Sequence, residues 1–154
     1  MKVTNTEAGI ALRIMIADDY FPDVVLVKEA LRSHGICFQM DVCGDGASAV
    51  RYVKDSERQH RRPDLFILDL NISGFSGLDV LQEIRERSLF DETPVAMLTS
   101  SVSPGKRAQA MQLKADAFLT KPSHLDEFLS GVGAALRQLL SSRSHSGTRN
   151  SGEV

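Results

Sequence analysis

Four apolar runs in this sequence of 154 residues end in side chains that could do chemistry. These side chains are Asp18 and Asp19 after one run, Asp69 after another, Thr99 at the end of a third, and Lys121 after a fourth. Three carboxylates, a hydroxyl and an ammonium are groups that bind a cation and stabilise a transferring phosphoryl group. Each residue alone also has an ordinary role in a turn or helix cap, so the inference rests on their combination.

The carboxylates are the most informative members of this set. Three carboxylates at one site repel each other, so they need a cation or a shared proton to coexist. Mg²⁺ prefers oxygen ligands and binds through one or two carboxylates plus phosphate, which suits Asp18 and Asp19. A carboxylate such as Asp69 can also attack phosphorus and form an aspartyl phosphate. Lys121 and the Thr99 hydroxyl would then each stabilise a phosphoryl oxygen.

The elements that must position these residues are short strands alternating with helices. Such alternation predicts an α/β fold with a doubly wound five-stranded parallel sheet, covered by helices on both faces. Ligand sites in such sheets lie at the carboxyl ends of the strands, near the switch in strand order. The expected strands are residues 12–17, 36–42, 65–68, 95–98 and 117–119.

Local signals predict where three helices begin. Ser76 and Ser103 have the sequence context of N-caps, and Pro104 after Ser103 suits the first helical position. Ser123 is expected to start the last helix. Its apolar stripe recurs at three-to-four residue spacing over residues 125–140.

Length and composition indicate one globular domain. We expect residues 1–10 to form a mobile N-terminal segment, 11–140 the folded domain and 141–154 a disordered polar tail. The net charge of −2 indicates neither a nucleic acid nor an acidic surface as partner. No run approaches the roughly 18 apolar residues of a membrane span, and no signal peptide is evident. We therefore expect a cytoplasmic protein without membrane contact, with Cys37 and Cys43 both reduced.

At its candidate site the sequence resembles the receiver domains of two-component response regulators. The resemblance covers about residues 12–140, and the order and spacing of its motifs match the family. The motifs are Ile16-Ala17-Asp18-Asp19, Leu68-Asp69-Leu70-Asn71-Ile72, Gly77, Leu98-Thr99-Ser100-Ser101 and Thr120-Lys121-Pro122. The resemblance implies the (βα)5 flavodoxin-like receiver fold. It also implies a signalling receiver that catalyses only its own phosphorylation and dephosphorylation.

The resemblance further implies a role for each matching residue. Asp69 would be the phosphoacceptor for a phosphohistidine of a sensor histidine kinase, with Mg²⁺ as the cofactor. The metal ligands would be Asp18, Asp19, Asp69 and the main-chain carbonyl of Asn71. Thr99 would be the switch hydroxyl, Lys121 the phosphate-stabilising lysine and Phe118 the aromatic switch residue. Lys121–Pro122 would be a candidate cis peptide.

A finer likeness is to single-domain regulators that pair with phytochrome-like kinases. The segment from Asp23-Val24 to Glu29-Ala30-Leu31 is typical of that group, as is Leu98-Thr99-Ser100-Ser101. The sequence departs from the pattern at Ser73, where the family usually has Pro, and at Tyr20-Phe21, where the subgroup has Asn-Pro. Ser73 is expected to loosen its loop, and Tyr20 to cover the site or reach the phosphate.

Such a domain would act as a phosphorylation-controlled binding module. Phosphorylation would draw Thr99 inward, let Phe118 rotate, and reshape the face formed by the helix after Ser103, the strand 117–119 and the last helix. Formation of a homodimer, or docking of a partner, through that face is the expected response. The last helix ends near Leu140 and leaves no room for a DNA-binding effector, so we expect no nucleic-acid partner.

Two other functions remain compatible with the same residues. A phosphohydrolase or phosphotransferase could use an aspartate nucleophile with Mg²⁺, although such folds usually need a cap or insertion and the loops here are short. A phosphorylation-independent adaptor could keep the fold alone, although the sign of that state would be loss of Asp69 or Lys121. Sustained turnover of a generic phosphate ester would favour the enzyme.

Overall fold

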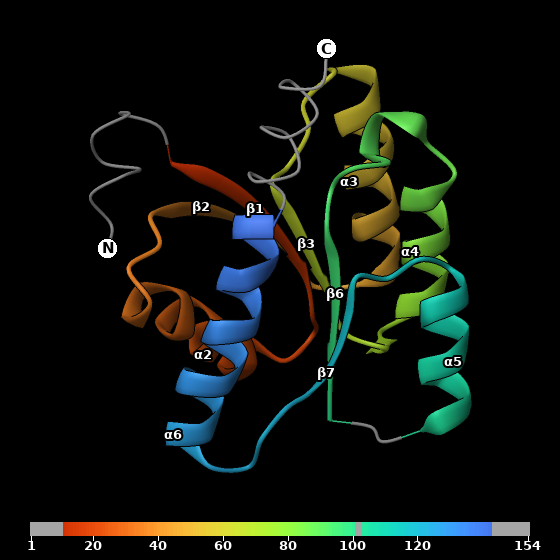
Figure 1. Cartoon of the computed structure of the whole chain (residues 1–154). Coiled ribbons are helices and arrows are strands. Elements are labelled where there is room, and N and C mark those ends of the chain that lie inside the picture. The colour runs from red at the N-terminus through yellow and green to blue at the C-terminus, as the bar shows by residue number, and fades with distance from the viewer. Residues whose placement is uncertain (1–10, 101–102, 143–154) are drawn as a thin grey trace.

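Five parallel strands form the central sheet in the computed structural model, which describes residues 11–100 and 103–142. Their order across the sheet is β2-β1-β3-β6-β7 (Figure 1). The bounds are β1 Leu12–Ala17, β2 Phe38–Cys43, β3 Leu65–Leu68, β6 Val95–Thr99 and β7 Ala117–Thr120. This order confirms the doubly wound, flavodoxin-like arrangement that the strand–helix alternation predicts.

Helices cover both faces of the sheet (Figure 1). One face carries α2 (Phe21–Ser33) and the C-terminal helix, and the other carries α3, α4 and α5. The bounds of these three are α3 Gly46–Arg58, α4 Gly77–Arg85 and α5 Pro104–Gln112, with a short 3₁₀ turn at Ser88–Phe90. Among the described residues, no helix combines the length and apolarity that a membrane span needs.

The C-terminal helix is irregular near its start. It comprises α6 (Leu125–Glu127), a π-helical turn at Phe128–Val132, and helical backbone over residues 133–142. The helix therefore extends to residue 142, two residues into the segment 141–154 that was expected to be a disordered tail. Residues 1–10 and 143–154, expected to be mobile or disordered, lie outside the described residues.

The core consists of two apolar layers, one on each side of the sheet. β3 and β6 lie inside the sheet and every one of their residues is buried, as expected for strands covered on both faces. Successive side chains of a strand point to opposite faces. In β1, Ile14 and Ile16 therefore pack toward α2 and the C-terminal helix, whereas Met15 and Ala17 pack toward α3 and α4.

Most of the predicted helix starts are confirmed. Ser76 Oγ accepts a hydrogen bond from the Leu78 amide at 3.1 Å, and Ser103 Oγ accepts one from the Lys106 amide at 3.4 Å. Ser123 does not start the last helix. His124 takes the N-cap position, because its carbonyl accepts the first intrahelical bond, from the Phe128 amide at 2.9 Å.

The second strand begins later than the predicted residue 36. Gly35 adopts a positive φ of 75°, which glycine allows at a helix end, and the Ile36 amide donates to the Leu31 carbonyl at 3.1 Å. Ile36 therefore belongs to the C-terminal cap of α2, and β2 starts at Phe38. Neither Cys37 nor Cys43 forms a disulfide, as predicted. Burial, with the charges of Asp41 and Asp45, raises the pKa of the Cys43 thiol to about 11.

Gly77 brings the start of α4 into close contact with the backbone of Asp69, which supplies a first prediction. A Cβ at residue 77 would lie 2.0 Å from the main-chain oxygen of Asp69. Gly77→Ala should therefore lower the free energy of unfolding by roughly 1–3 kcal/mol, since backbone must move to make room. Urea unfolding measures the change.

Gly105→Ala is the matched control for this substitution. A Cβ at residue 105, in the first turn of α5, meets no heavy atom within 4 Å. This variant should match the wild type or gain up to about 1 kcal/mol of helix stability. Equal stability of Gly77→Ala and the wild type would contradict the close approach of α4 to the Asp69 loop.

Candidate functional site

The two central acidic residues follow adjacent strands at the carboxyl edge of the sheet. Asp18 follows β1 and Asp69 follows β3, and the two strands pair in parallel with Ala17 opposite Leu68. The Asp69 amide donates to the Ala17 carbonyl at 3.0 Å. The chain order reverses between β1 and β3, so these carboxylates lie at the topological switch point where open parallel sheets bind ligands.

Lys121 brings three carboxylates together. It follows β7, and its Nζ donates to Asp69 Oδ2 at 2.7 Å, to Asp18 Oδ2 at 3.0 Å and to Asp23 Oδ2 at 2.7 Å. The side chains of Lys121, Asp18 and Asp69 are 8%, 2% and 10% exposed, so this contact is largely shielded from water. The predicted convergence of Asp18, Asp69 and Lys121 is therefore present.

The charges at this site are not balanced. When ionised, three carboxylates around one ammonium leave two negative charges uncompensated. Burial raises the pKa of the Asp18 carboxyl, although the Tyr20 amide and Lys121 act to lower it. Burial alone would lower the pKa of Lys121, but hydrogen bonds to Asp23, Asp69 and Asp18 outweigh it and raise the pKa. The site therefore keeps its ammonium charged and has a surplus of negative charge.

Main-chain amides orient the two central carboxylates. Asp18 Oδ1 accepts from the Tyr20 amide at 2.8 Å, and Asp69 Oδ1 accepts from the Asn71 amide at 3.2 Å. In both residues the other oxygen, Oδ2, then faces Lys121. Local backbone thus sets the direction of each carboxylate before any ligand arrives.

Asp19 contacts the loop that follows β3. It is exposed, and its Oδ2 accepts a hydrogen bond from Ser73 Oγ at 3.1 Å. Ser73 precedes Gly74, at φ 81°, in the turn of a small antiparallel pair, β4 (Asn71–Ile72) and β5 (Phe75–Ser76). The Ser73 carbonyl also accepts a hydrogen bond from the Gly46 amide at 3.0 Å. The loop that Ser73 was expected to loosen is held by these contacts, which the sequence did not predict.

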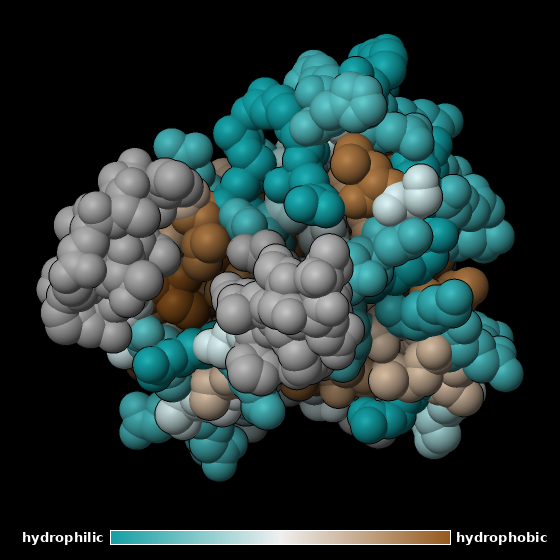
Figure 2. Space-filling model, turned by 45° about the horizontal axis from the view of Figure 1, so that its top comes forward, coloured by the Kyte–Doolittle hydropathy of each residue, from teal (hydrophilic) through white to brown (hydrophobic). Residues whose placement is uncertain are grey.

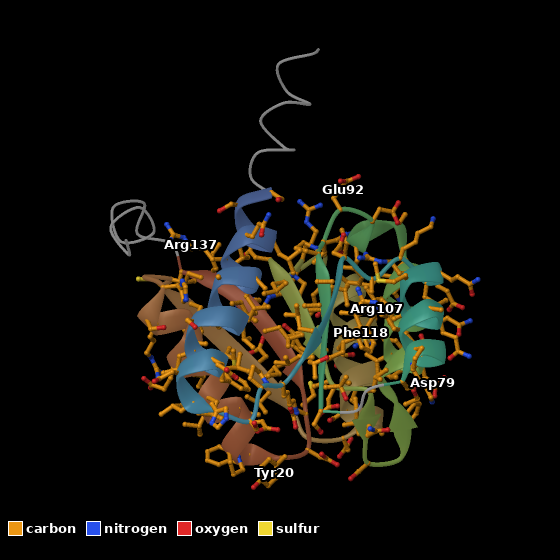
Figure 3. All side chains as sticks on the ribbon, turned by 60° about the horizontal axis from the view of Figure 1, so that its bottom comes forward. Tyr20, Asp79, Glu92, Arg107, Phe118 and Arg137 are labelled. Carbon is orange, nitrogen blue, oxygen red and sulfur yellow. The ribbon has the colours of Figure 1, made fainter. Side chains whose placement is uncertain are left out.

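Thr99 and Phe118 lie on paired strands beside the carboxylates. Thr99 is the last residue of β6 and is fully buried. Its carbonyl accepts a hydrogen bond from the Lys121 amide at 2.8 Å. Phe118 in β7 is half-buried and pairs with Met97. The Arg107 guanidinium of α5 lies 5.6 Å from the Phe118 ring centroid, and its Nη1 donates to the Phe118 carbonyl at 3.4 Å (Figure 3). Ser101 of the predicted motif lies outside the described residues.

The expected cis peptide and the expected covering of the site by Tyr20 are both wrong, whereas a contact of Tyr20 with a phosphate stays a prediction. The described residues contain no cis peptide bond, so Lys121–Pro122 is trans, the form that X-Pro bonds usually favour by about 0.5–1 kcal/mol. Tyr20 does not cover the site. Tyr20 as a residue is 58% exposed, and its side chain projects outward at the edge of the molecule (Figure 3), while its amide donates to Asp18.

Asp23 is the site residue that the sequence analysis missed. It lies in the first turn of α2, and its contact with Lys121 is as short as that of Asp69. An acidic residue in the first turn of a helix is ordinarily explained by the helix dipole. The sequence feature that could have indicated Asp23 is its position one short turn after Asp18, at the same edge of the sheet.

The chemistry of the donor set, and not its present arrangement, suits a divalent cation such as Mg²⁺. Within the described residues, no group of three His, Cys, Asp or Glu side chains is arranged to hold a metal ion. Instead, the Lys121 ammonium bridges Asp18 and Asp69. The nearby donors are nevertheless hard oxygens with surplus negative charge, as Mg²⁺ prefers. On the side of the molecule away from this edge, the described surface is mainly hydrophilic with scattered apolar patches (Figure 2).

Comparison with known proteins gives one matching family. The model of the response regulator receiver domain matches residues 14–132. The transcriptional regulatory protein TrcR of Mycobacterium tuberculosis is 31% identical over 137 residues, which make up 89% of this chain and 48% of that protein. The chain therefore spans about half the length of this curated relative.

Solved structures agree with this match. The phosphorylated cyanobacterial phytochrome response regulator RcpA is 25% identical with a TM-score of 0.76, over 86% of this chain and 95% of that one. The Mn²⁺-bound form of response regulator Rcp1 is 28% identical with a TM-score of 0.72, over 80% and 90%. A response regulator receiver domain from Rhodospirillum rubrum is 26% identical with a TM-score of 0.71, over 84% and 91%.

Removal of the central ammonium supplies a second prediction. Lys121→Met should lower the free energy of unfolding at neutral pH by roughly 3 kcal/mol, because it leaves buried carboxylates facing each other without a cation. Millimolar Mg²⁺ should restore part of this loss. Thermal unfolding with and without Mg²⁺ measures both effects.

Lys54→Met on α3 removes one exposed positive charge away from the site and is the control. It should change stability by less than about 0.5 kcal/mol, with no response to Mg²⁺ beyond that of the wild type. A Lys121→Met protein as stable as the control would mean that the three carboxylates do not depend on the ammonium.

Proposed function

The chain belongs to the response regulator receiver domain family, and from this premise we propose that Asp69 accepts a phosphoryl group from the phosphohistidine of a sensor kinase. The observation that supports the proposal is the buried Asp69 carboxylate, held 2.7 Å from the Lys121 ammonium at the switch point of the sheet. The likeness to RcpA makes a phytochrome-like kinase our proposed donor. We place this exchange in the cytoplasm.

The proposed reaction is an in-line displacement at phosphorus. An Asp69 carboxylate oxygen forms the new bond to phosphorus, the P–N bond of the phosphohistidine breaks, and its electron pair returns to the imidazole. Lys121 moves from the carboxylate to a phosphoryl oxygen, and the Thr99 hydroxyl donates to another. Such transfer depends mainly on positioning and charge neutralisation, which these residues supply.

A divalent cation completes the charge balance in this proposal. Asp18, Asp19, Asp69 and the main-chain carbonyl of Asn71 would hold Mg²⁺. When bound, Mg²⁺ neutralises charge on the transferring group. The surplus of negative charge around Lys121 supports this assignment, and Rcp1 has been solved with Mn²⁺ bound.

We propose that the output lies on the face of α5, β7 and the C-terminal helix. A phosphoryl group on Asp69 would draw in Thr99 at the end of β6, and Phe118 on the neighbouring strand β7 would respond. β7 is the edge strand of the sheet, so its movement alters a surface that a second copy can reach. A homodimer through this face is the proposed response.

Phosphoryl uptake tests the central proposal. Wild-type protein incubated with acetyl phosphate and Mg²⁺ should gain the mass of one phosphoryl group, whereas Asp69→Asn should gain none. Removal of Mg²⁺ with a chelator should abolish the gain. Asp91→Asn, which alters an exposed carboxylate, is the control and should label like the wild type. Intact-mass spectrometry measures all four.

Two results would contradict this proposal. Uptake that persists in Asp69→Asn would place the acceptor elsewhere, and absence of uptake under every condition would favour a phosphorylation-independent adaptor. Sustained multiple turnover of a generic phosphate ester would instead indicate a phosphohydrolase. The described connections at this edge, such as residues 18–20 and 121–124, are short and form no cap.

The switch hydroxyl supplies a further prediction. Thr99→Ala should retain part of the phosphoryl uptake but lose most of the phosphorylation-linked change in association, because the hydroxyl that would follow the phosphoryl group is gone. Thr99→Ser keeps the hydroxyl and should retain the response. Analytical ultracentrifugation with and without acetyl phosphate measures association. An identical response in Thr99→Ala and the wild type would refute the switch role of Thr99.

A further inference from the structure

The Lys121 ammonium has a third carboxylate partner that the proposed reaction does not use. A lysine ammonium has three N–H donors, and at Lys121 these reach Asp18, Asp69 and Asp23. Asp18 and Asp69 are the residues proposed to hold the cation, whereas Asp23 comes from helix α2. Its contact of 2.7 Å equals that of Asp69.

Asp23 is fixed by the start of its helix. It is the third residue of α2, after Phe21 and Pro22, and its amide donates to the Tyr20 carbonyl at 3.0 Å. Pro22 restricts the backbone of this turn, and a carboxylate near a helix N-terminus is stabilised by the helix dipole. The Asp23 side chain is 20% exposed, so it approaches Lys121 from the solvent side of the cluster.

A bound divalent cation changes the balance around Lys121. The cation would then offset part of the negative charge of Asp18 and Asp69, so these carboxylates would attract the ammonium less strongly. The cation and the ammonium would also repel each other. With only those two carboxylates, Lys121 would be drawn toward solvent. A carboxylate outside the proposed metal ligands is needed to keep the ammonium beside Asp69.

We propose that Asp23 is a positioning residue that holds the Lys121 ammonium in the site when the cation binds. It thereby keeps Lys121 available to the incoming phosphoryl group, a consequence that rests on the proposed function. Holding the Lys121 ammonium in place does not depend on phosphoryl transfer. It involves only the cation and the three contacts of Lys121 with Asp18, Asp23 and Asp69.

Residue-resolved lysine labelling tests this role with Mg²⁺ alone as the probe. Limited acetylation followed by peptide mass spectrometry gives the labelling rate of Lys121, with exposed Lys54 as the internal reference. Wild-type Lys121 should stay protected with and without Mg²⁺. In Asp23→Asn it should be protected without Mg²⁺ but label about tenfold faster at saturating Mg²⁺, which corresponds to the loss of one charge-assisted hydrogen bond.

Two further variants serve as controls for this test. Glu29→Gln removes the same charge from an exposed position of α2, where Glu29 pairs with Arg32, and should behave as the wild type. Asp23→Glu keeps the carboxylate and should restore much of the protection. Equal labelling of Asp23→Asn and the wild type at saturating Mg²⁺ would overturn the proposal, as would loss of protection in the wild type.

The readout separates this proposal from the proposed function. In acetyl phosphate, Asp23→Asn should take up the phosphoryl group about tenfold more slowly than Glu29→Gln at saturating Mg²⁺. If the wild type never takes up a phosphoryl group but Lys121 loses protection only in Asp23→Asn, the positioning role stands and the phosphoacceptor proposal fails.

Discussion

A single ammonium, Lys121 Nζ, bridges carboxylates from three separate elements: the end of β1, the end of β3 and the first turn of α2. This contact requires the fold around it. The parallel sheet places Asp18 and Asp69 side by side, and the pairing of β7 with β6 brings Lys121 to the same edge. The positions of these residues are fixed because β3 and β6 are buried along their whole length and hold the strand ends in register. The surplus of negative charge that results stabilises nothing by itself, and in the proposed function a cation and the Lys121 ammonium offset it.

Much of this arrangement follows from the sequence, because the carboxyl ends of parallel strands share one edge. Apolar runs locate β1, β3, β6 and β7, and the residues after them are then neighbours without further information. Residues placed by loops and helices are different. Asp23 depends on the direction in which α2 leaves the sheet, and Ser73 reaches Asp19 only because β4 and β5 form a hairpin. Neither geometry is encoded in a local pattern. The cis expectation at Lys121–Pro122 fails for a related reason, since motif likeness carries no information on the isomer of one bond.

The site is connected to the surface through two paired strands. Thr99 and Lys121 share a main-chain hydrogen bond at the ends of β6 and β7, and Phe118 lies two residues before Thr120 in β7. Arg107 of α5 packs on the Phe118 ring, so a movement of that ring involves the helix that covers it. A cation–π contact of this kind contributes about 0.5–1 kcal/mol at an exposed site. The proposed switch therefore needs to overcome only a weak contact, and Phe118 has no hydroxyl that would need a new partner if it moved.

The central claim is that Asp18 and Asp69, the two carboxylates that Lys121 bridges, are ligands of one divalent cation, and amide NMR during a Mg²⁺ titration tests it most directly. The amides of Tyr20 and Asn71 report on Asp18 and Asp69, to which they donate. Both resonances should shift together and saturate with a single ion per chain. Unchanged resonances at millimolar Mg²⁺, or shifts that follow different binding curves, would contradict this claim.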